Sequence, residues 1–110
     1  MLVVDDDASL RLLCRVNLEL DGFRVEEAAT PEAARAALAV ERPALVVLDL
    51  MLGTVESGDL LDELRANGVP VVVLSGLVDV ERFAGRASAV LAKPFDPSSL
   101  SDVAKALTVG

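Results

Sequence analysis

The sequence predicts an α/β domain in which a five-stranded parallel sheet is covered by helices on both faces. Short runs of valine and leucine, each bounded by polar or turn residues, are typical of strands that are buried on both faces. These runs alternate with helix-spaced apolar patterns along all 110 residues, without a linker or a repeat. Such alternation favours a doubly wound sheet with right-handed crossovers. We expect one domain spanning residues 1–110, a size that suits a single core.

The first strand and the first helix are predicted from the apolar pattern of residues 2–21. The run at 2–4 is continuously apolar, and leucines and a valine then recur at helical spacing. The positions on this helical stripe are Leu10, Leu13, Val16 or Asn17, and Leu20. Asp21-Gly22 is expected to end the helix. Cys14 lies within the same pattern, and we expect it to be a buried core residue.

The next strand–helix–strand unit occupies residues 23–48. The second strand, at 23–28, is poorer in apolar residues than the others, which suits the edge of a sheet. Thr30-Pro31 is a helix start, because a capping hydroxyl precedes a proline at the first helical position. This helix is expected to end near Arg42-Pro43, before a third strand at 45–48.

Two more strands and three more helices are predicted in the second half of the chain. A helix over 59–66 is stopped by Asn67-Gly68, and a fourth strand occupies 71–74. A short helix of weak pattern, 79–86, precedes the fifth strand at 90–92. Asp96-Pro97 repeats the signal of a cap followed by proline and opens a last helix that runs to about Leu107.

Composition excludes several classes of function. The formal net charge of −8 disfavours direct binding to nucleic acid, whose phosphates such a surface repels. The chain has no histidine, which excludes catalytic triads that need one and phosphohistidine carriers. No apolar run is long enough to span a membrane. A single cysteine cannot form an internal disulfide, and a reducing cytoplasm is the expected compartment.

Polar side chains follow four of the predicted strands directly. They are Asp5-Asp6-Asp7, Asp49, Ser75-Gly76 and Lys93-Pro94. In an open parallel sheet, ligands bind outside the carboxyl ends of the strands. Carboxylates, a hydroxyl and an ammonium group are therefore expected to converge on one crevice. This is the set of groups that phosphoryl transfer to a carboxylate requires.

Three of the carboxylates are candidate metal ligands. Asp5, Asp6 and Asp49 should stand close together, since they end neighbouring strands. Bare carboxylates repel one another at short range, and a hard cation such as Mg²⁺ relieves the repulsion while binding carboxylate, carbonyl and water oxygens. An alternative explanation is that the run Asp5-Asp6-Asp7 only caps the following helix. We expect Asp7 to be the cap, a role that does not explain Asp49.

Two further strand ends carry groups that suit a phosphoryl oxygen. Lys93 would pair with a carboxylate in the resting state and with a phosphoryl oxygen afterwards, unless it is an ordinary surface lysine. Ser75 would donate a hydrogen bond to a phosphoryl oxygen, unless it only caps a helix. Pro94 is a candidate for a preceding cis peptide bond, since the chain must turn at this strand end.

Four segments together resemble the receiver domain of bacterial two-component response regulators. They are Val3-Val4-Asp5-Asp6-Asp7, Val46-Val47-Leu48-Asp49-Leu50-Met51, Val72-Val73-Leu74-Ser75-Gly76 and Ala92-Lys93-Pro94-Phe95. Each is weak alone, but the four at these spacings are specific and the resemblance covers the whole chain. It implies a flavodoxin-like sheet with strand order 2-1-3-4-5.

The resemblance also implies a role for each site residue. Asp49 would be the phosphoacceptor, taking a phosphoryl group from the phosphohistidine of a sensor kinase. The ligands of Mg²⁺ (or Mn²⁺) would be Asp5, Asp6, Asp49 and the backbone carbonyl of Met51. The phosphate-binding and switch residues would be Ser75, Gly76 and Lys93. The implied partners are a sensor histidine kinase or phosphotransfer protein and an output domain or downstream protein, with a homodimer as a further option. The domain would signal rather than act as an enzyme.

The chain departs from the family pattern at three places. Val90 stands where the family usually has Tyr or Phe, so the aromatic half of the usual switch is missing. The loop after Asp49 lacks the usual proline and is longer than the common pattern, and the stretch between Ser75 and Lys93 is shorter than usual. Val90 and the altered loop after Asp49 favour an alternative function, that of a receiver-like interaction module whose partners bind regardless of phosphorylation. The intact set of acids, metal site and lysine opposes this alternative.

An aspartyl-phosphate hydrolase and a flavin carrier both fit the sequence less well. The hydrolase would use Asp49 as its nucleophile and would need a second acid two residues later, where Met51 stands. The flavin carrier would need a hydroxyl- and glycine-rich phosphate loop after the first strand, where three aspartates would instead repel phosphate.

Overall fold

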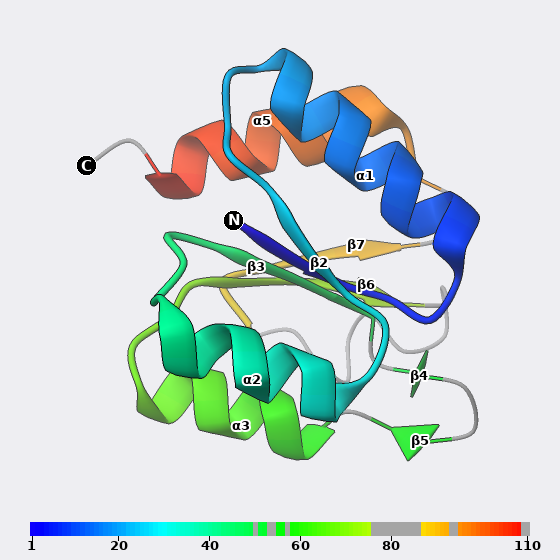
Figure 1. Cartoon of the computed structure of the whole chain (residues 1–110). Helices are drawn as coiled ribbons and strands as arrows, with labels where there is room; N and C mark the ends of the chain where they lie inside the picture. The colour runs from blue at the N-terminus through cyan, green and yellow to red at the C-terminus, as the bar shows by residue number, and fades with distance from the viewer. Residues whose placement is uncertain (50, 53–54, 57, 76–86, 93–94, 109–110) are drawn as a thin grey trace.

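Five parallel strands form the central sheet of the protein (Figure 1). The computed structural model describes residues 1–49, 51–52, 55–56, 58–75, 87–92 and 95–108. The strands are β1 (Leu2–Val4), β2 (Glu26–Ala28), β3 (Val46–Asp49), β6 (Val71–Ser75) and β7 (Ala89–Ala92). Their order in the sheet is β2-β1-β3-β6-β7. Numbered among themselves, the five strands follow the order 2-1-3-4-5, which confirms the predicted fold.

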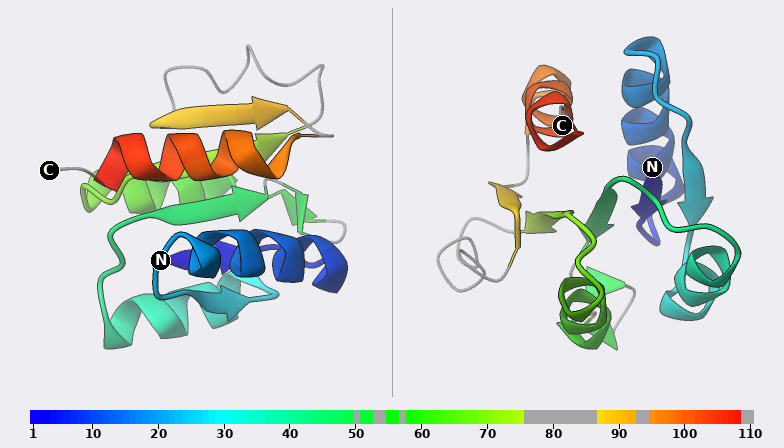
Figure 2. Two further views of the ribbon diagram at one scale, coloured as in Figure 1. Left: turned by 90° about the horizontal axis from the view of Figure 1, so that it is seen from above. Right: turned by 90° about the vertical axis from the view of Figure 1, so that its left-hand side faces the viewer.

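Helices cover both faces of this sheet, as Figure 2 shows. Within the described residues the helices are α1 (Ala8–Leu20), α2 (Pro31–Val40), α3 (Gly58–Ala66) and α5 (Pro97–Thr108). α1 and α5 lie on one face, and α2 and α3 lie on the other (Figure 1). The predicted start of α2 is confirmed, because the Thr30 side chain accepts a hydrogen bond from the N–H of Ala33 at 3.1 Å and Pro31 is the first helical residue.

The core consists of two apolar layers, one on each side of the sheet. On the side of α1 and α5 it includes Val3, Cys14, Leu18, Val47, Val72 and Leu100. On the side of α2 and α3 it includes Leu2, Val4, Leu48, Leu61, Leu64 and Val73. Successive residues of one strand enter opposite layers because side chains alternate along a strand. The prediction of strands buried on both faces is confirmed for β1, β3 and β6, and so is the burial of Cys14.

The buried face of α1 differs from the predicted stripe. Cys14 and Leu18 are buried and Leu10 packs beside them, whereas Leu20 is 80% exposed. Leu13 and Val16 are also exposed. A spacing of four residues, 10–14–18, aligns one face of the helix with the sheet, and the apolar side chains at the other positions turn towards solvent.

The first edge strand is shorter than predicted. β2 begins at Glu26 rather than at residue 23, because Phe23 donates its N–H to the carbonyl of Leu18 at 3.1 Å and still belongs to the turn after α1. Gly22 has a φ of +93°, which permits this turn. As predicted, the strand lies at the edge of the sheet, where it pairs with β1.

Two further differences lie after β3. A small antiparallel pair of strands, β4 (Met51–Leu52) and β5 (Val55–Glu56), follows Asp49, where a loop was expected. The predicted helix over 79–86 lies outside the described residues. None of the helices in the described part of the chain has the length and apolar character needed to cross a membrane.

Candidate functional site

Three carboxylates meet at the carboxyl ends of β1 and β3. These two strands are neighbours in the sheet, with Val4 paired to Leu48, so that Asp5 and Asp49 occupy adjacent strand ends. Asp6 follows in the turn that leads to α1. One carboxylate oxygen from each of Asp5, Asp6 and Asp49 lies within 4.8 Å of the others. The structure thus brings together the three acids that the sequence predicts to be metal ligands.

The cluster is partly sealed from solvent. Asp5 has no exposed surface and Asp49 is 5% exposed, whereas Asp6 is exposed. Buried carboxylates are costly unless they are hydrogen-bonded or neutralised, and mutual repulsion adds to that cost. Hard oxygen donors at this spacing, with one side open to water, fit a small divalent cation that keeps part of its water shell. The cluster can therefore hold a metal ion.

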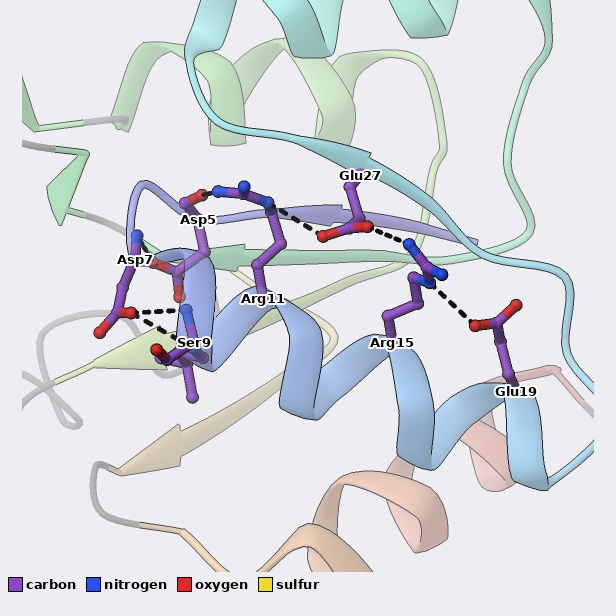
Figure 3. A network of polar contacts seen from close by, with 8 residues as sticks. Asp5, Asp7, Ser9, Arg11, Arg15, Glu19 and Glu27 are labelled. Atoms are coloured by element: carbon purple, nitrogen blue, oxygen red, sulfur yellow. Dashed lines mark hydrogen bonds and ion pairs between the residues drawn. The ribbon is translucent and has the colours of Figure 1, made fainter.

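Hydrogen bonds fix the β1–α1 turn, and Figure 3 shows those between Asp5 and Asp7 and at the start of the helix. The N–H of Asp5 donates to the carbonyl of Ala28 in β2 at 3.0 Å. The side-chain Oδ1 of Asp5 accepts the N–H of Asp7 at 2.9 Å. These contacts position the first acid by both its backbone and its side chain, so the cluster is preorganised by the β1–α1 turn.

Asp7 caps helix α1, as predicted. Its Oδ1 accepts the N–H of Ser9 at 2.9 Å and that of Leu10 at 3.3 Å. These are two of the donors that an α-helix leaves without intrahelical partners at its start. The three consecutive aspartates therefore divide between two tasks, with Asp5 and Asp6 in the acid cluster and Asp7 at the helix end.

An ion-pair network that the sequence did not predict adjoins the cluster. Arg11 donates through Nη1 to the backbone carbonyl of Asp5 at 2.7 Å and through Nε to Glu27 at 3.0 Å (Figure 3). Arg15 donates to the other oxygen of Glu27 at 2.6 Å and to Glu19 at 2.9 Å. The hydrogen bond from Arg15 and then that from Arg11 hold the pKa of Glu27 below its ordinary value, although some loss of hydration at this carboxylate opposes the shift. The sequence feature that could have indicated this network is the pair Arg11 and Arg15, four residues apart on α1.

The remaining predicted site residues are only partly described. Ser75 ends β6 and pairs with Ala92 of β7, so its backbone lies at the same edge of the sheet as the acids. Met51 is the first residue of β4. Gly76, Lys93 and Pro94 lie outside the described residues.

Val90, which stands at the position of the missing aromatic, lies within β7 opposite Val73. It is half-buried and packs against the apolar layer on the side of α2 and α3. Its side chain therefore contributes to the core layer at this edge of the sheet.

The fold and the acid cluster are those of a signalling receiver domain, and comparison with known proteins agrees. The family profile described as the response regulator receiver domain matches residues 1–105. The chain belongs to this family. Its members are signalling proteins of two-component systems, and their receiver domains interact with histidine kinases and with output domains.

Relatives of the chain are longer regulators. The chain is 39% identical over 105 residues to the DNA-binding response regulator MtrA of Mycobacterium leprae, with 91% of this chain and 47% of the relative covered. It is 38% identical over 105 residues to the probable transcriptional regulator ycf27 of Porphyridium aerugineum, with 91% and 44% covered. The chain thus spans less than half the length of these relatives.

Solved structures show the same architecture. The receiver domain of NtrX from Brucella abortus superimposes with a TM-score of 0.90 and is 31% identical, over 97% of this chain and 96% of that one. The chemotaxis response regulator CheY4 of Vibrio cholerae gives a TM-score of 0.85 at 24% identity, over 96% and 95%. The second likeness supports the fold alone.

Proposed function

We propose that this domain receives a phosphoryl group on Asp49, with Mg²⁺ bound by the acid cluster, and passes the resulting state to an output partner. The observation that carries the proposal is the meeting of Asp5, Asp6 and Asp49 within 4.8 Å at the carboxyl ends of β1 and β3. Family membership supports it, because receiver domains work with histidine kinases. The signalling unit would be residues 1–110, and the cytoplasm would be its compartment.

Each residue near the strand ends has a proposed task. Asp6 would bind Mg²⁺ (or Mn²⁺) directly, Asp5 would bind it largely through water, and the backbone carbonyl of Met51 would supply another oxygen. Bound Mg²⁺ would neutralise part of the charge on the transferring phosphoryl oxygens. On the protein side, Ser75, Gly76 and Lys93 would contact those oxygens. The donor is a sensor histidine kinase or a phosphotransfer protein.

The transfer is an in-line displacement at phosphorus. A carboxylate oxygen of Asp49 forms the new P–O bond while the P–N bond to the donor histidine breaks, and that histidine nitrogen takes the leaving electron pair. The product is an acyl phosphate. Asp49 suits this role because it is almost fully buried, so that few waters compete with the incoming phosphoryl group.

One observation favours a second candidate function. Val90 replaces the aromatic residue of the usual switch and packs into the core layer. A receiver-like module that binds its partner regardless of phosphorylation would tolerate this replacement. The acid cluster opposes this candidate, since an interaction module has no need to crowd three carboxylates.

The test is incubation of the domain with acetyl phosphate, followed by intact-mass spectrometry. We expect the mass of one phosphoryl group to be gained in the presence of Mg²⁺ and to be lost when a chelator is added beforehand. Asp6→Ala should bind Mg²⁺ more weakly and gain phosphate more slowly, because one carboxylate of the cluster is missing. A domain that gains no phosphate with any divalent cation would contradict the proposal and support the second candidate.

A further inference from the structure

The β1–α1 turn that carries Asp5 and Asp6 is held by a side chain outside the acid cluster. Arg11, in the first turns of α1, reaches back and donates through Nη1 to the backbone carbonyl of Asp5 at 2.7 Å (Figure 3). The contact is partly buried. A hydrogen bond from a charged donor is stronger than a neutral one, and partial burial limits competition from water.

The guanidinium of Arg11 is itself fixed from the other side. Its Nε donates to Oε1 of Glu27 in the edge strand β2 at 3.0 Å. The other oxygen of Glu27 accepts from Arg15 at 2.6 Å, so the carboxylate is held between two arginines. Because the guanidinium is planar and rigid, the bond to Glu27 sets the direction of the bond to Asp5. The chain of contacts thus runs from β2 through Arg11 to the turn.

We propose that Arg11 is a positioning residue for the metal site, one that fixes the backbone between Asp5 and Asp6 and thereby the spacing of their carboxylates. This inference rests on the proposed function, since it takes the acid cluster to be the Mg²⁺ site. Outer groups that orient metal ligands contribute strongly to metal affinity although they do not touch the ion. Arg11 acts here on the backbone that carries two of the ligands.

The positioning role and the positive charge of Arg11 predict opposite changes in Mg²⁺ affinity when Arg11 is replaced. A cation close to the acid cluster repels a divalent ion, so removal of the Arg11 charge alone would strengthen Mg²⁺ binding. Loss of the positioning contact would weaken it, because the Asp5–Asp6 segment could then move away from Asp49. Arg11→Lys separates the two effects. Lysine keeps the positive charge, but it lacks the planar guanidinium that donates to Glu27 and to the Asp5 carbonyl at the same time.

Arg15 provides a matched control on the same helix. It shares Glu27 with Arg11 and lies one turn further along α1, and it pairs with Glu27 and Glu19 rather than with the β1–α1 turn. Arg15→Gln and Arg11→Gln each remove a positive charge and a bond to Glu27. Only Arg11 also contacts the carbonyl of Asp5. Loss of the Arg11 charge would by itself strengthen Mg²⁺ binding, so weaker binding by Arg11→Gln than by Arg15→Gln would report the loss of that contact.

The experiment is a Mg²⁺ titration of the 110-residue domain followed by amide NMR shifts, which suit a chain without tryptophan or tyrosine. We expect Arg11→Gln and Arg11→Lys to weaken Mg²⁺ binding about tenfold. This is the lower end of the range of affinity losses that follow when a group that orients metal ligands is mutated. Arg15→Gln should stay within about twofold of the parental affinity, since the turn keeps its support. The same spectra, with urea unfolding, show whether each variant retains the fold.

The outcomes separate this inference from the function on which it rests. A parental domain that binds no Mg²⁺ contradicts the proposed function and the inference together. A parental domain that binds Mg²⁺, with Arg11→Gln equal to Arg15→Gln in affinity, overturns the positioning role alone. Tighter binding by Arg11→Gln also overturns it, in favour of plain charge repulsion.

Discussion

Replacement of Asp7 by alanine should destabilise the domain without disabling its metal site. The side chain of Asp7 accepts two backbone N–H groups at the start of α1, at 2.9 and 3.3 Å. Alanine leaves both donors without this acceptor, which typically costs about 1 kcal/mol in the free energy of unfolding. The lost negative charge at the positive end of the helix adds about 0.3 kcal/mol at an exposed position. We therefore expect a loss of about 1.3 kcal/mol.

The loss is large enough to measure by thermal and urea unfolding. For a domain of about this size, 1 kcal/mol lowers the melting temperature by roughly 4 °C, so Asp7→Ala should melt about 5 °C below the parental protein. Asp7→Asn is the matched control, because it keeps an acceptor oxygen at the cap and removes only the charge. It should lose no more than about 0.5 kcal/mol.

The same variants test the division of labour among the three consecutive aspartates. Asp7 has its oxygen on the helix end rather than in the acid cluster, so Asp7→Asn should bind Mg²⁺ like the parental domain. Two results would refute this reasoning. One is Asp7→Ala unfolding at the parental urea concentration, and the other is Asp7→Asn weakening Mg²⁺ binding as strongly as Asp6→Ala does.

Two further predictions concern stability. The pKa of Glu27 in the folded protein is lowered mainly by Arg15 and then by Arg11. The ion pairs of Glu27 therefore stabilise the fold at pH values above the ordinary glutamate pKa of about 4.3. This stabilisation is lost as the pH falls through the lower pKa that Glu27 has in the folded protein. Glu27→Gln should therefore lower the free energy of unfolding, measured with urea, by up to about 1 kcal/mol at about pH 7 and by progressively less towards about pH 3.5. A loss that stays constant over this pH range would contradict the prediction. Leu18→Ala should cost about 2–5 kcal/mol because Leu18 is fully buried. Leu20 lies on the same helix but is 80% exposed, so Leu20→Ala should change the free energy of unfolding by less than about 0.5 kcal/mol. Equal losses in the two variants would show that the buried face of α1 is misassigned.

The architecture was predictable because its strongest signals are local. Valine-rich runs such as Val71–Ser75 predict buried strands without reference to the rest of the chain, and Thr30-Pro31 marks a helix start. The parallel arrangement then brings Asp5 and Asp49 to the same edge of the sheet. The meeting of the acids was therefore predictable, and so was the capping role of Asp7.

What the sequence did not predict depends on contacts between distant segments. The apolar stripe of α1 was assigned from the spacing of leucines, whereas the face that packs on the sheet is chosen by tertiary contact. That face includes Leu18, which the predicted stripe omitted, beside the correctly predicted Cys14. The contact between Arg11 and Glu27 joins residues 16 positions apart, and no local pattern announces it. Two-residue strands such as β4 have too few residues to show a period.

The central claim is that the phosphoryl group resides on Asp49, and the most direct measurement is chemical localisation of that group. The domain is phosphorylated with acetyl phosphate and Mg²⁺ and then treated with borohydride, which reduces an acyl phosphate to the alcohol and so converts the modified aspartate into homoserine. Peptide mass spectrometry then locates the converted residue. We predict homoserine at position 49 in the parental domain and none at any position in Asp49→Asn. Homoserine at position 5 or 6, or a conversion that persists in Asp49→Asn, would contradict the assignment.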